Sequence, residues 1–458
     1  MKTWAIPVAI LIVIAAYLRI PDLSDRPMHA DEAVYAYKFQ TLLQTGNWSY
    51  EPGEYHGPVL HYLTVLPVRL GGLTETTLRI GPALLGILLV LAPLLLANEL
   101  GKNEALAAAA LVAVSPAMVY YSRYYIPEML LALLTATMLV AAYRYTRERK
   151  LVWALGAGLI VGLMFATKET AIIAAAAALI ATRQLPDWRH VLSGLGIACV
   201  VILLLLGPRE TLESISVYID RAVHGDRHIH PWYYYLQIAL RREAVIVILA
   251  IVGAVASKEH IVRFVAIYTL SMIVIYSLIP YKTPWCLLGF LYGLIVLAGV
   301  GLMRIARTKA VAVALMAVCG VYLFHQAFVT SRQYSANPNN PYAYAHTSRD
   351  VYAIRDQMEK FRNLPVQVIS AQNVWPLPWY LRSFPQVAWR RAVTDDMRPA
   401  PVILISAEME PALLHLLYEV LPPGQRPLYV NLFPKYAELR PGLELRCYVQ
   451  QSVLAATE

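Results

Sequence analysis

The sequence predicts an α-helical polytopic membrane protein that is followed by a small α/β domain. Of its 458 residues, 58% are hydrophobic and only 15% are charged, and the mean hydropathy is +0.50. A soluble protein of this length could not hide so much apolar surface from water, so the excess must face lipid. Apolar runs of roughly 20 residues, the length that crosses a bilayer, recur as far as Phe328 and then stop.

About eleven of these runs are predicted to span the membrane. They lie near residues 4–20, 77–97, 104–122, 127–143, 151–166, 169–182, 190–207, 243–256, 261–279, 284–303 and 309–328. The first run resembles a signal peptide, but no small-residue cleavage site follows it, so we expect it to stay as a span. The predicted domains are therefore a transmembrane domain over 1–328 and a soluble domain over 329–458.

The basic residues between the spans predict an orientation. Lys and Arg collect in short cytoplasmic loops because they resist translocation, and here such loops fall on one side if the N-terminus is cytoplasmic. The loops 21–76, 122–127, 167–168, 208–242 and 280–283 are then outside, with everything after 328. We expect an inner-membrane protein with an extracytoplasmic C-terminal domain. These loops also account for the net charge of +9, so no nucleic-acid partner is expected.

Local patterns predict the elements outside the spans. In the first outer loop, 21–76, the segment 31–44 is predicted to be an amphipathic helix, and 58–70 is a second apolar segment that is too short to span. Both are expected to lie along the membrane surface. After a linker rich in Asn and Pro at 337–341, a helix is predicted over 348–361 behind a Thr347 cap. Strands are predicted at 365–370, 386–390, 400–406, 427–432 and 444–449, with a helix near 409–420.

The residues His29, Ala30, Asp31 and Glu32 open the first of the two surface segments. Acids at a helix N-terminus favour the helix dipole, which is the structural interpretation. The functional interpretation is a general base that faces a substrate carried by the membrane. At this point both interpretations stand.

The order of motifs in this loop resembles the signature of the GT-C glycosyltransferases. Asp31 and Glu32 are followed by Tyr35, then by Gly-Asn-Trp at 46–48 and His-Gly-Pro at 56–58. The chain is similar to the branch with the lipid A aminoarabinose transferases and the protein O-mannosyltransferases, above all to a prokaryotic family known as flippase-activity-associated. The likeness covers residues 1 to about 300. It implies a GT-C fold, a polyprenyl-phosphate sugar donor, and a glycan, lipid or protein acceptor.

Later motifs extend the resemblance, although each could equally be an anchor at the membrane interface. Relatives have an acid shortly after the position of Arg123, usually Asp. Here it is Glu128, which is expected to orient the acceptor or to stabilise cationic groups around Asp31. The resemblance also implies that Lys168, between two short spans, and Lys282, in a Lys-x-Pro segment, contact the carrier phosphate. The stretch 221–235 is basic and aromatic, as in an aromatic belt or a lid over the donor head group.

These motifs give three groups of candidate residues, which predicted topology places at one membrane face. The catalytic candidates are Asp31, Glu32 and Glu128. The candidates for binding donor phosphate or lipid are Lys168, Lys282, Arg123, Arg221, Arg227 and His56. The candidates for an acceptor or sugar pocket are Tyr35, Tyr124, Trp232, Tyr235 and Trp285.

No resident cofactor is expected, and a divalent metal stays open. His29, His56 and His61 share the first outer loop and are the metal-ligand candidates. Among the relatives, the oligosaccharyltransferases need a divalent ion, whereas the aminoarabinose branch does not use one for catalysis. A nucleotide-sugar donor needs a metal for its pyrophosphate, while a lipid monophosphate donor does not.

The residue types suit one reaction in particular. When an acceptor hydroxyl attacks the anomeric carbon of a polyprenyl-phosphate sugar, the leaving phosphate gains about one negative charge, which each well-placed cation stabilises by about 3 kcal/mol. One carboxylate that takes the proton and several cations fit this reaction, and they predict inversion at the anomeric carbon.

Two other functions are consistent with a membrane protein of this kind. A flippase or transporter of polyprenyl-linked sugars would place polar groups at the centres of its spans and show inverted repeats, neither of which the sequence has. A polysaccharide ligase or polymerase shares the lipid donor but would not require the Asp-Glu loop. A scaffold protein without enzymatic activity fits the sequence least well, because it gives no reason for the charged residues to cluster at one face. The sequence does not name the sugar or the acceptor.

The predicted orientation can be checked with reporters. An alkaline-phosphatase fusion after residue 328 should be active, and a reporter that works only in the cytoplasm should be silent there. The opposite result would mean that the spans are miscounted and that the candidate residues do not share a face.

Overall fold

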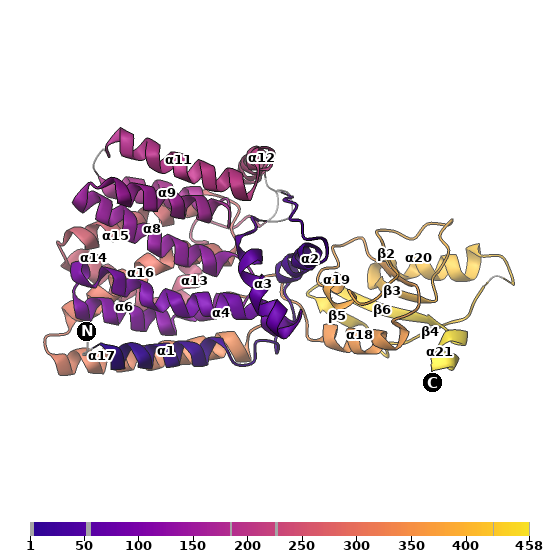
Figure 1. Ribbon diagram of the computed structural model, residues 1–458. Helices are drawn as coiled ribbons and strands as arrows, with labels where there is room; N and C mark the ends of the chain where they lie inside the picture. The colour runs from indigo at the N-terminus through magenta and orange to yellow at the C-terminus, as the bar shows by residue number, and fades with distance from the viewer. Residues whose placement is uncertain (1–3, 52–55, 184–185, 225–227, 425, 458) are drawn as a thin grey trace. The chain divides into compact units, whose positions relative to one another are not determined.

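The computed structural model describes residues 4–51, 56–183, 186–224, 228–424 and 426–457. Its contacts divide the chain into two compact units (Figure 1). The first unit comprises Met1–Ser24, Phe39–Ser335 and Asn339–Tyr344, and the second comprises Asp25–Lys38, Ala336–Pro338 and Ala345–Glu458. This division differs from the predicted boundary at 328, because the start of the first outer loop joins the C-terminal residues.

The first unit is a bundle of apolar helices that lie side by side, with α11 at one margin and α1 and α17 at the other (Figure 1). Within the described residues, 6 helices are long and apolar enough to cross a membrane, or up to 7 if the bent pair α6–α7 forms one span. These are α4 with its continuation (Glu75–Leu100), α8 (Glu128–Glu148), α11 (Trp188–Leu205), α15 (His260–Leu278), η2 with α16 (Pro284–Ile305), α17 with η3 (Lys309–Gln333), and the pair α6 (Lys102–Val114) and α7 (Pro116–Ser122).

Four further predicted spans coincide with shorter apolar helices. They are α1 (Ala5–Arg19), α9 (Leu151–Phe165), α10 (Ala171–Thr182) and α14 (Ala244–Ala256). The fold class is confirmed as a mostly helical GT-C type membrane fold with a small C-terminal sheet domain, while the number of spans stays a prediction.

Glycines let two pairs of helices approach closely. A Cβ added to Gly301 on α16 would lie 1.9 Å from the Leu249 carbonyl oxygen of α14, and one added to Gly158 on α9 would lie 2.1 Å from the Gly194 carbonyl oxygen of α11. Both distances are far below van der Waals contact. Small residues at helix contacts are how helices associate in lipid, where no hydrophobic effect drives them together.

The long outer loops contain helices of their own. The predicted helix is present as α2 (Ala30–Thr45), and the second apolar segment forms the helix α3 (Val59–Gly71). The loop 208–242, which was not predicted to be helical, contains α12 (Pro208–His224) and α13 (Tyr234–Arg242). Both are amphipathic and polar on average, so neither gives the hydropathy signal of a span.

The second unit is built on a 6-stranded mixed sheet with the strand order β2-β1-β3-β6-β4, in which β5 also pairs with β6. The strands are β1 (Val366–Ile369), β2 (Val387–Arg390), β3 (Val402–Ser406), β4 (Tyr429–Asn431), β5 (Ala437–Arg440) and β6 (Leu443–Gln450). β1 pairs in parallel with β2 and β3, and β6 runs antiparallel to its neighbours. Strands β1 and β3 are buried along their whole length, so the sheet is covered on both faces.

Helices cover the two faces of this sheet. Ile403 and Ile405 pack against Leu413, Leu416 and neighbouring residues of α20 (Glu410–His415) and η6 (Leu416–Val420). On the other side, α18 (Asp350–Met358) brings the Met358 sulfur to 3.7 Å from that of Cys447. Two short helices, α19 (Leu377–Tyr380) and α21 (Gln451–Thr457), complete the unit.

Two details of this unit correct the sequence predictions. The Thr347 cap is wrong, because Arg349 is the N-cap of α18 and the Thr347 hydroxyl instead donates to the Met28 carbonyl oxygen at 2.7 Å. Strand β5 was also missed. It has only four residues and an irregular register against β6, so its alternation is too short to detect.

Candidate functional site

His29 caps the helix that carries Asp31 and Glu32. The Asp31 N–H donates to His29 Nδ1 at 3.1 Å, and the His29 N–H donates to Glu32 Oε2 at 2.9 Å. This is a reciprocal capping box in which an imidazole replaces the usual hydroxyl. Burial lowers the pKa of His29, although Asp31 and Glu32 act in the opposite direction. A neutral ring whose Nδ1 accepts a hydrogen bond must carry its proton on Nε2.

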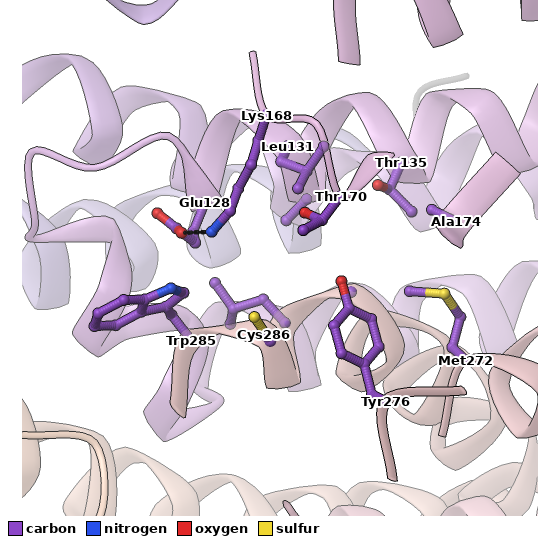
Figure 2. Close-up of a pocket in the computed structure, with 13 residues that line it drawn as sticks. Glu128, Leu131, Thr135, Lys168, Thr170, Ala174, Met272, Tyr276, Trp285 and Cys286 are labelled. Atoms are coloured by element: carbon purple, nitrogen blue, oxygen red, sulfur yellow. Dashed lines mark hydrogen bonds and ion pairs between the residues drawn. The ribbon is translucent and has the colours of Figure 1, made fainter. Parts of the chain in front are cut away.

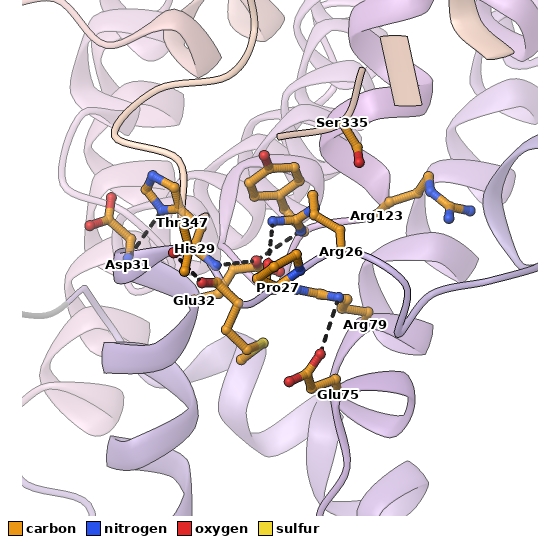
Figure 3. A network of polar contacts seen from close by, with 12 residues as sticks. Arg26, Pro27, His29, Asp31, Glu32, Glu75, Arg79, Arg123, Ser335 and Thr347 are labelled. Carbon is orange, nitrogen blue, oxygen red and sulfur yellow. Dashed lines mark hydrogen bonds and ion pairs between the residues drawn. The ribbon is translucent and has the colours of Figure 1, made fainter. Parts of the chain in front are cut away.

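The two adjacent acids have different environments, as Figure 3 shows. Glu32 is fully buried, and its Oε2 lies 2.8 Å from the Arg26 guanidinium as well as accepting from His29. Asp31 is half-buried, and among the described residues its carboxylate has no hydrogen bond or ion pair. Glu32 is therefore committed to the fold, whereas the Asp31 carboxylate is available to a substrate. Tyr35, on the same helix, is buried.

The first unit contains a pocket with an ion pair at one end (Figure 2). Lys168, in the turn between α9 and α10, pairs with Glu128 at the start of α8, and both side chains are buried. The Lys168 ammonium also lies 6.0 Å from the centroid of the Trp285 ring. Burial disfavours the charged form of Lys168, but the Glu128 carboxylate, together with the nearby Cys286 and Tyr281, holds the pKa of Lys168 above its usual value.

The rest of the pocket is mainly apolar. Beyond the ion pair it is lined by Leu131, Ala132, Thr135, Thr170, Ala174, Met272, Tyr276, Cys286, Leu288 and Gly289. Figure 2 shows the labelled side chains in two facing rows, one with Leu131, Thr135, Thr170 and Ala174 and the other with Met272, Tyr276 and Cys286. A buried ammonium beside apolar walls suits an anionic group that is attached to a hydrocarbon chain.

Lys282 has no acidic partner among the residues that the structure describes. Its ammonium donates to the carbonyl oxygens of His230, at 3.1 Å, and Ile279. It is buried, and burial lowers the pKa of Lys282. The backbone of 228–230 pairs with that of 280–282, through a bridge between Ile229 and Tyr281. The basic and aromatic stretch is thus joined to the segment that carries Lys282.

His56 belongs to a second polar network in the first unit. Its Nδ1 lies 2.7 Å from Glu169 Oε2 and 2.7 Å from the Tyr218 hydroxyl, and the Tyr50 hydroxyl donates to the other oxygen of Glu169. The network links the first outer loop, the turn after Lys168 and the helix α12. Glu169, the partner of His56, directly follows Lys168 in the chain.

The remaining candidates are dispersed. Arg123 donates to the carbonyl oxygens of Arg19, the last residue of α1, and of Pro21 and Asp22 just after it, at 2.7–3.0 Å. Tyr124 is buried in a cluster of tyrosines, Tyr235 is buried and donates to the Thr283 carbonyl oxygen at 3.2 Å, and Trp232 is exposed. The Arg221 side chain and all of Arg227 lie outside the described residues. Of the predicted residues, the structure brings Glu128, Lys168 and Trp285 into one pocket.

The described residues do not fit a metal site. No group of three or more His, Cys, Asp or Glu side chains among them could hold an ion. Of the histidine candidates, His61 is buried between aromatic rings, and its Nδ1 lies 3.2 Å from the Tyr125 hydroxyl. His29 uses its Nδ1 for the helix cap.

Several residues around these sites were not predicted from the sequence. Glu169, whose carboxylate lies 2.7 Å from His56 Nδ1, directly follows Lys168 in the chain, and this adjacency was the one available signal for it. Tyr276, Cys286 and Met272 line the pocket from positions inside or beside apolar spans, where they look like ordinary lipid-facing residues.

Comparison with known proteins supports the fold. A family model described as dolichyl-phosphate-mannose-protein mannosyltransferase matches residues 55–208. No curated protein sequence matches the chain. The crystal structure of ArnT from Cupriavidus metallidurans bound to undecaprenyl phosphate is similar over 96% of this chain and 97% of that one, with a TM-score of 0.72 and 16% identity.

Two further solved structures are similar at lower scores. The oligosaccharyltransferase AglB from Archaeoglobus fulgidus, in complex with an inhibitory peptide and a dolichol-phosphate, matches 94% of this chain and 73% of that one, with a TM-score of 0.58 and 14% identity. The arabinofuranosyltransferase AftD from Mycobacteria matches 98% of this chain and 40% of that one, with a TM-score of 0.56 and 16% identity. The predicted resemblance to the GT-C superfamily is confirmed, and these structures establish the fold.

The different environments of the two acids can be tested through stability. Glu32→Ala should lower the melting temperature in detergent, because a buried Arg26 and the His29 N–H lose their partner, at a cost of roughly 3 kcal/mol. Glu32→Gln should be milder, since glutamine also completes a capping box. Asp31→Asn should melt like the wild type. Equal losses for Glu32→Ala and Asp31→Asn would contradict this assignment.

Proposed function

We propose that this chain, which has the GT-C fold, is an inverting glycosyltransferase that moves a sugar from a polyprenyl-phosphate donor to a glycan, lipid or protein acceptor at the outer face of the membrane. The observation that carries the proposal is the pocket with a buried ammonium, Lys168, at one end and apolar walls along the rest. A polyprenyl phosphate has the same division, with an anionic head and a hydrocarbon tail. The bound undecaprenyl phosphate of ArnT supports this choice of ligand.

In the proposed reaction, the acceptor oxygen forms a bond to the anomeric carbon as the bond from that carbon to the phosphate oxygen breaks. The acceptor proton passes to the Asp31 carboxylate, and the electron pair of the broken bond stays on the phosphate. The leaving group is stabilised as an anion and needs no proton donor. Attack opposite to the leaving group inverts the anomeric centre.

Asp31 suits the role of base better than Glu32 does. A general base must be ionised and must reach the proton that it removes. The Asp31 carboxylate has no partner among the described residues, whereas Glu32 is held by Arg26 and His29. We therefore assign Glu32 to positioning: it fixes the first turn of α2 and hence the direction of Asp31.

The two lysines suit the donor phosphate in different ways. Lys168 must share its charge between Glu128 and an arriving phosphate, so Glu128 orients the ammonium and weakens its hold on the product. Among the described residues, the Lys282 ammonium donates to carbonyl oxygens, which are weaker partners than an anion. A phosphate that reaches Lys282 therefore replaces a poor partner with a good one.

The transporter rival calls for a direct test. In the described residues Glu128, Lys168 and Lys282 lie at helix ends and in turns, which suits the enzyme, but a broken span such as α6–α7 also occurs in transporters. Purified protein in liposomes, given a radiolabelled polyprenyl-phosphate sugar and candidate acceptors, separates the two functions. Transfer of label to an acceptor supports the enzyme, whereas movement of the lipid between leaflets without transfer supports the rival.

Asp31→Asn should abolish transfer while leaving expression and membrane insertion unchanged. The substitution is nearly isosteric, and general bases contribute about 10²–10⁴-fold to the rate. The matched control is Asp25→Asn, an exposed acid six positions earlier in the same loop, which should keep full activity. If the folded Asp31→Asn variant retains more than about a tenth of the wild-type rate, Asp31 is not the base.

Removing the lysines should impair use of the donor and leave acceptor KM unchanged. For Lys282→Met we expect kcat/KM for the donor to fall about tenfold or more, because an ammonium that contacts the phosphate acts in both the ground and transition states. Lys168→Ala would leave Glu128 buried and unpaired, so the double variant Lys168→Met/Glu128→Gln is the better test. Exposed Lys258→Ala is the control. Wild-type donor kinetics in the folded lysine variants would refute the assignment.

A further inference from the structure

The span formed by α6 and α7 is broken at Ser115 and Pro116, where the two helix axes differ by 55°. With 13 residues, α6 alone rises only about 20 Å, which is less than the hydrocarbon core of a bilayer. The break therefore falls at a depth where water is scarce. The peptide groups that two helix ends leave free must find partners inside the protein there.

On the side of α6, the partner is an arginine. Arg19 is fully buried on α1 and donates from Nη1 to the Ala113 carbonyl oxygen at 2.8 Å and from Nη2 to that of Val112 at 3.0 Å. These carbonyls belong to the last turn of α6. A cation thus meets the carbonyl end of the helix, which is the favourable sign.

On the side of α7, the partner is a glutamate. Glu243, fully buried between α13 and α14, accepts three hydrogen bonds on its Oε1 atom. They come from the Ala117 N–H at 2.7 Å, the Ser115 hydroxyl at 3.0 Å and the Tyr342 hydroxyl at 3.2 Å. The other oxygen, Oε2, has no hydrogen-bond partner among the residues described. One oxygen therefore carries every contact that joins Glu243 to α7.

The helix that Glu243 holds leads directly to the pocket. The Tyr121 ring of α7 lies edge-on to Trp285, with centroids 6.5 Å apart, and its hydroxyl donates to the Tyr342 carbonyl oxygen at 3.0 Å. After α7 ends at Ser122, a short turn brings the chain to Glu128, the partner of Lys168. The direction of α7 consequently influences both an aromatic wall and the acidic end of the pocket.

We propose that Glu243 is a positioning residue for the donor pocket, acting with Arg19 to fix the bend between α6 and α7. Neither residue lines the pocket, so neither takes part in the chemistry. Arg19 bonds the α6 side of the bend and Glu243 bonds the α7 side. Because these contacts fix the direction of α7, they also fix the positions of Glu128 and Trp285. The kinetic readout of this role rests on the proposed function, whereas the labelling readout requires only that the pocket bind lipid phosphate.

The test compares Glu243→Ala with Glu243→Gln in the full-length protein in detergent. The glutamine amide oxygen can take the place of Oε1, and the amide nitrogen falls where Oε2 has no partner, so Glu243→Gln should behave like the wild type. In Glu243→Ala the three donors lose their acceptor, and kcat/KM for the donor should fall roughly ten- to a hundredfold while the acceptor KM stays unchanged. Glu259→Ala, which removes an exposed ion pair with Arg304, is the control.

The second readout is alkylation of Cys286, which lines the pocket. Labelling by N-ethylmaleimide, mapped to this cysteine by mass spectrometry, should be slowed by undecaprenyl phosphate in the wild type and Glu243→Gln. The lipid should give no protection in Glu243→Ala. If Glu243→Ala cannot be recovered folded, Ser115→Ala/Tyr342→Phe removes two of the three hydrogen bonds and should weaken protection.

The outcomes separate the two proposals. Wild-type protein that is neither active nor protected refutes the proposed function. Wild-type protein that is active and protected, with a folded Glu243→Ala variant that matches it, overturns the positioning role alone. A loss of activity in Glu243→Ala and Glu243→Gln alike also overturns it, because the glutamine keeps every contact on which the role depends.

Discussion

Polar groups that enter hydrocarbon must be bonded within the protein, and this requirement governs the described membrane unit. Its buried arginines serve the backbone. Arg19 bonds the last turn of α6, Arg123 bonds carbonyls at and just after the end of α1, and Arg79 donates to the Leu23 carbonyl oxygen. A guanidinium has five donors in a planar fork, so a single side chain can bond several carbonyls at a helix end. The bundle can thus contain breaks and turns whose backbone groups are buried from water.

The lysines differ from the arginines because their ammonium groups can also bind a ligand. Lys168 is paired with one carboxylate, and Lys282 is bonded by two carbonyl oxygens. Each has a compact charge with donors that can be redirected to a ligand. Their opposite pKa shifts follow from this difference, because a carboxylate stabilises the ammonium and burial beside carbonyls does not. One membrane unit therefore uses arginine for architecture, and its lysines are the cations suited to a substrate.

Much of the fold could be predicted from the sequence, because lipid demands long apolar runs and such runs are visible in one dimension. The helix α2 and five of the six strands were also predictable from local patterns. Contacts between distant residues could not be predicted. The pair of Glu128 with Lys168 and the carbonyl partners of Arg123 depend on how helices pack. The polar helix α12 and the four-residue strand β5 lack the length or hydropathy that a pattern needs.

The candidate site shows the same division. The Asp-Glu motif made this segment a candidate, but only the contacts of the structure show that Glu32 has partners in the protein and that the Asp31 carboxylate has none among the described residues. Adjacent carboxylates look identical in a sequence. The two carboxylates differ here because Glu32 contacts Arg26 and the backbone N–H of His29. The type of neither residue reveals that it contacts Glu32. The catalytic assignment of Asp31 therefore rests on a difference that sequence patterns cannot contain.

The break at Ser115 and Pro116 has a consequence for how this chain can change through evolution. Arg19, Pro116 and Glu243 come from three distant segments, yet each is useful only while the other two are present. A lineage that replaced the proline and closed the helix would leave a buried arginine and a buried acid without their peptide partners. Relatives with a continuous helix here should therefore lack both charges, and the three positions should be inherited or lost as a set.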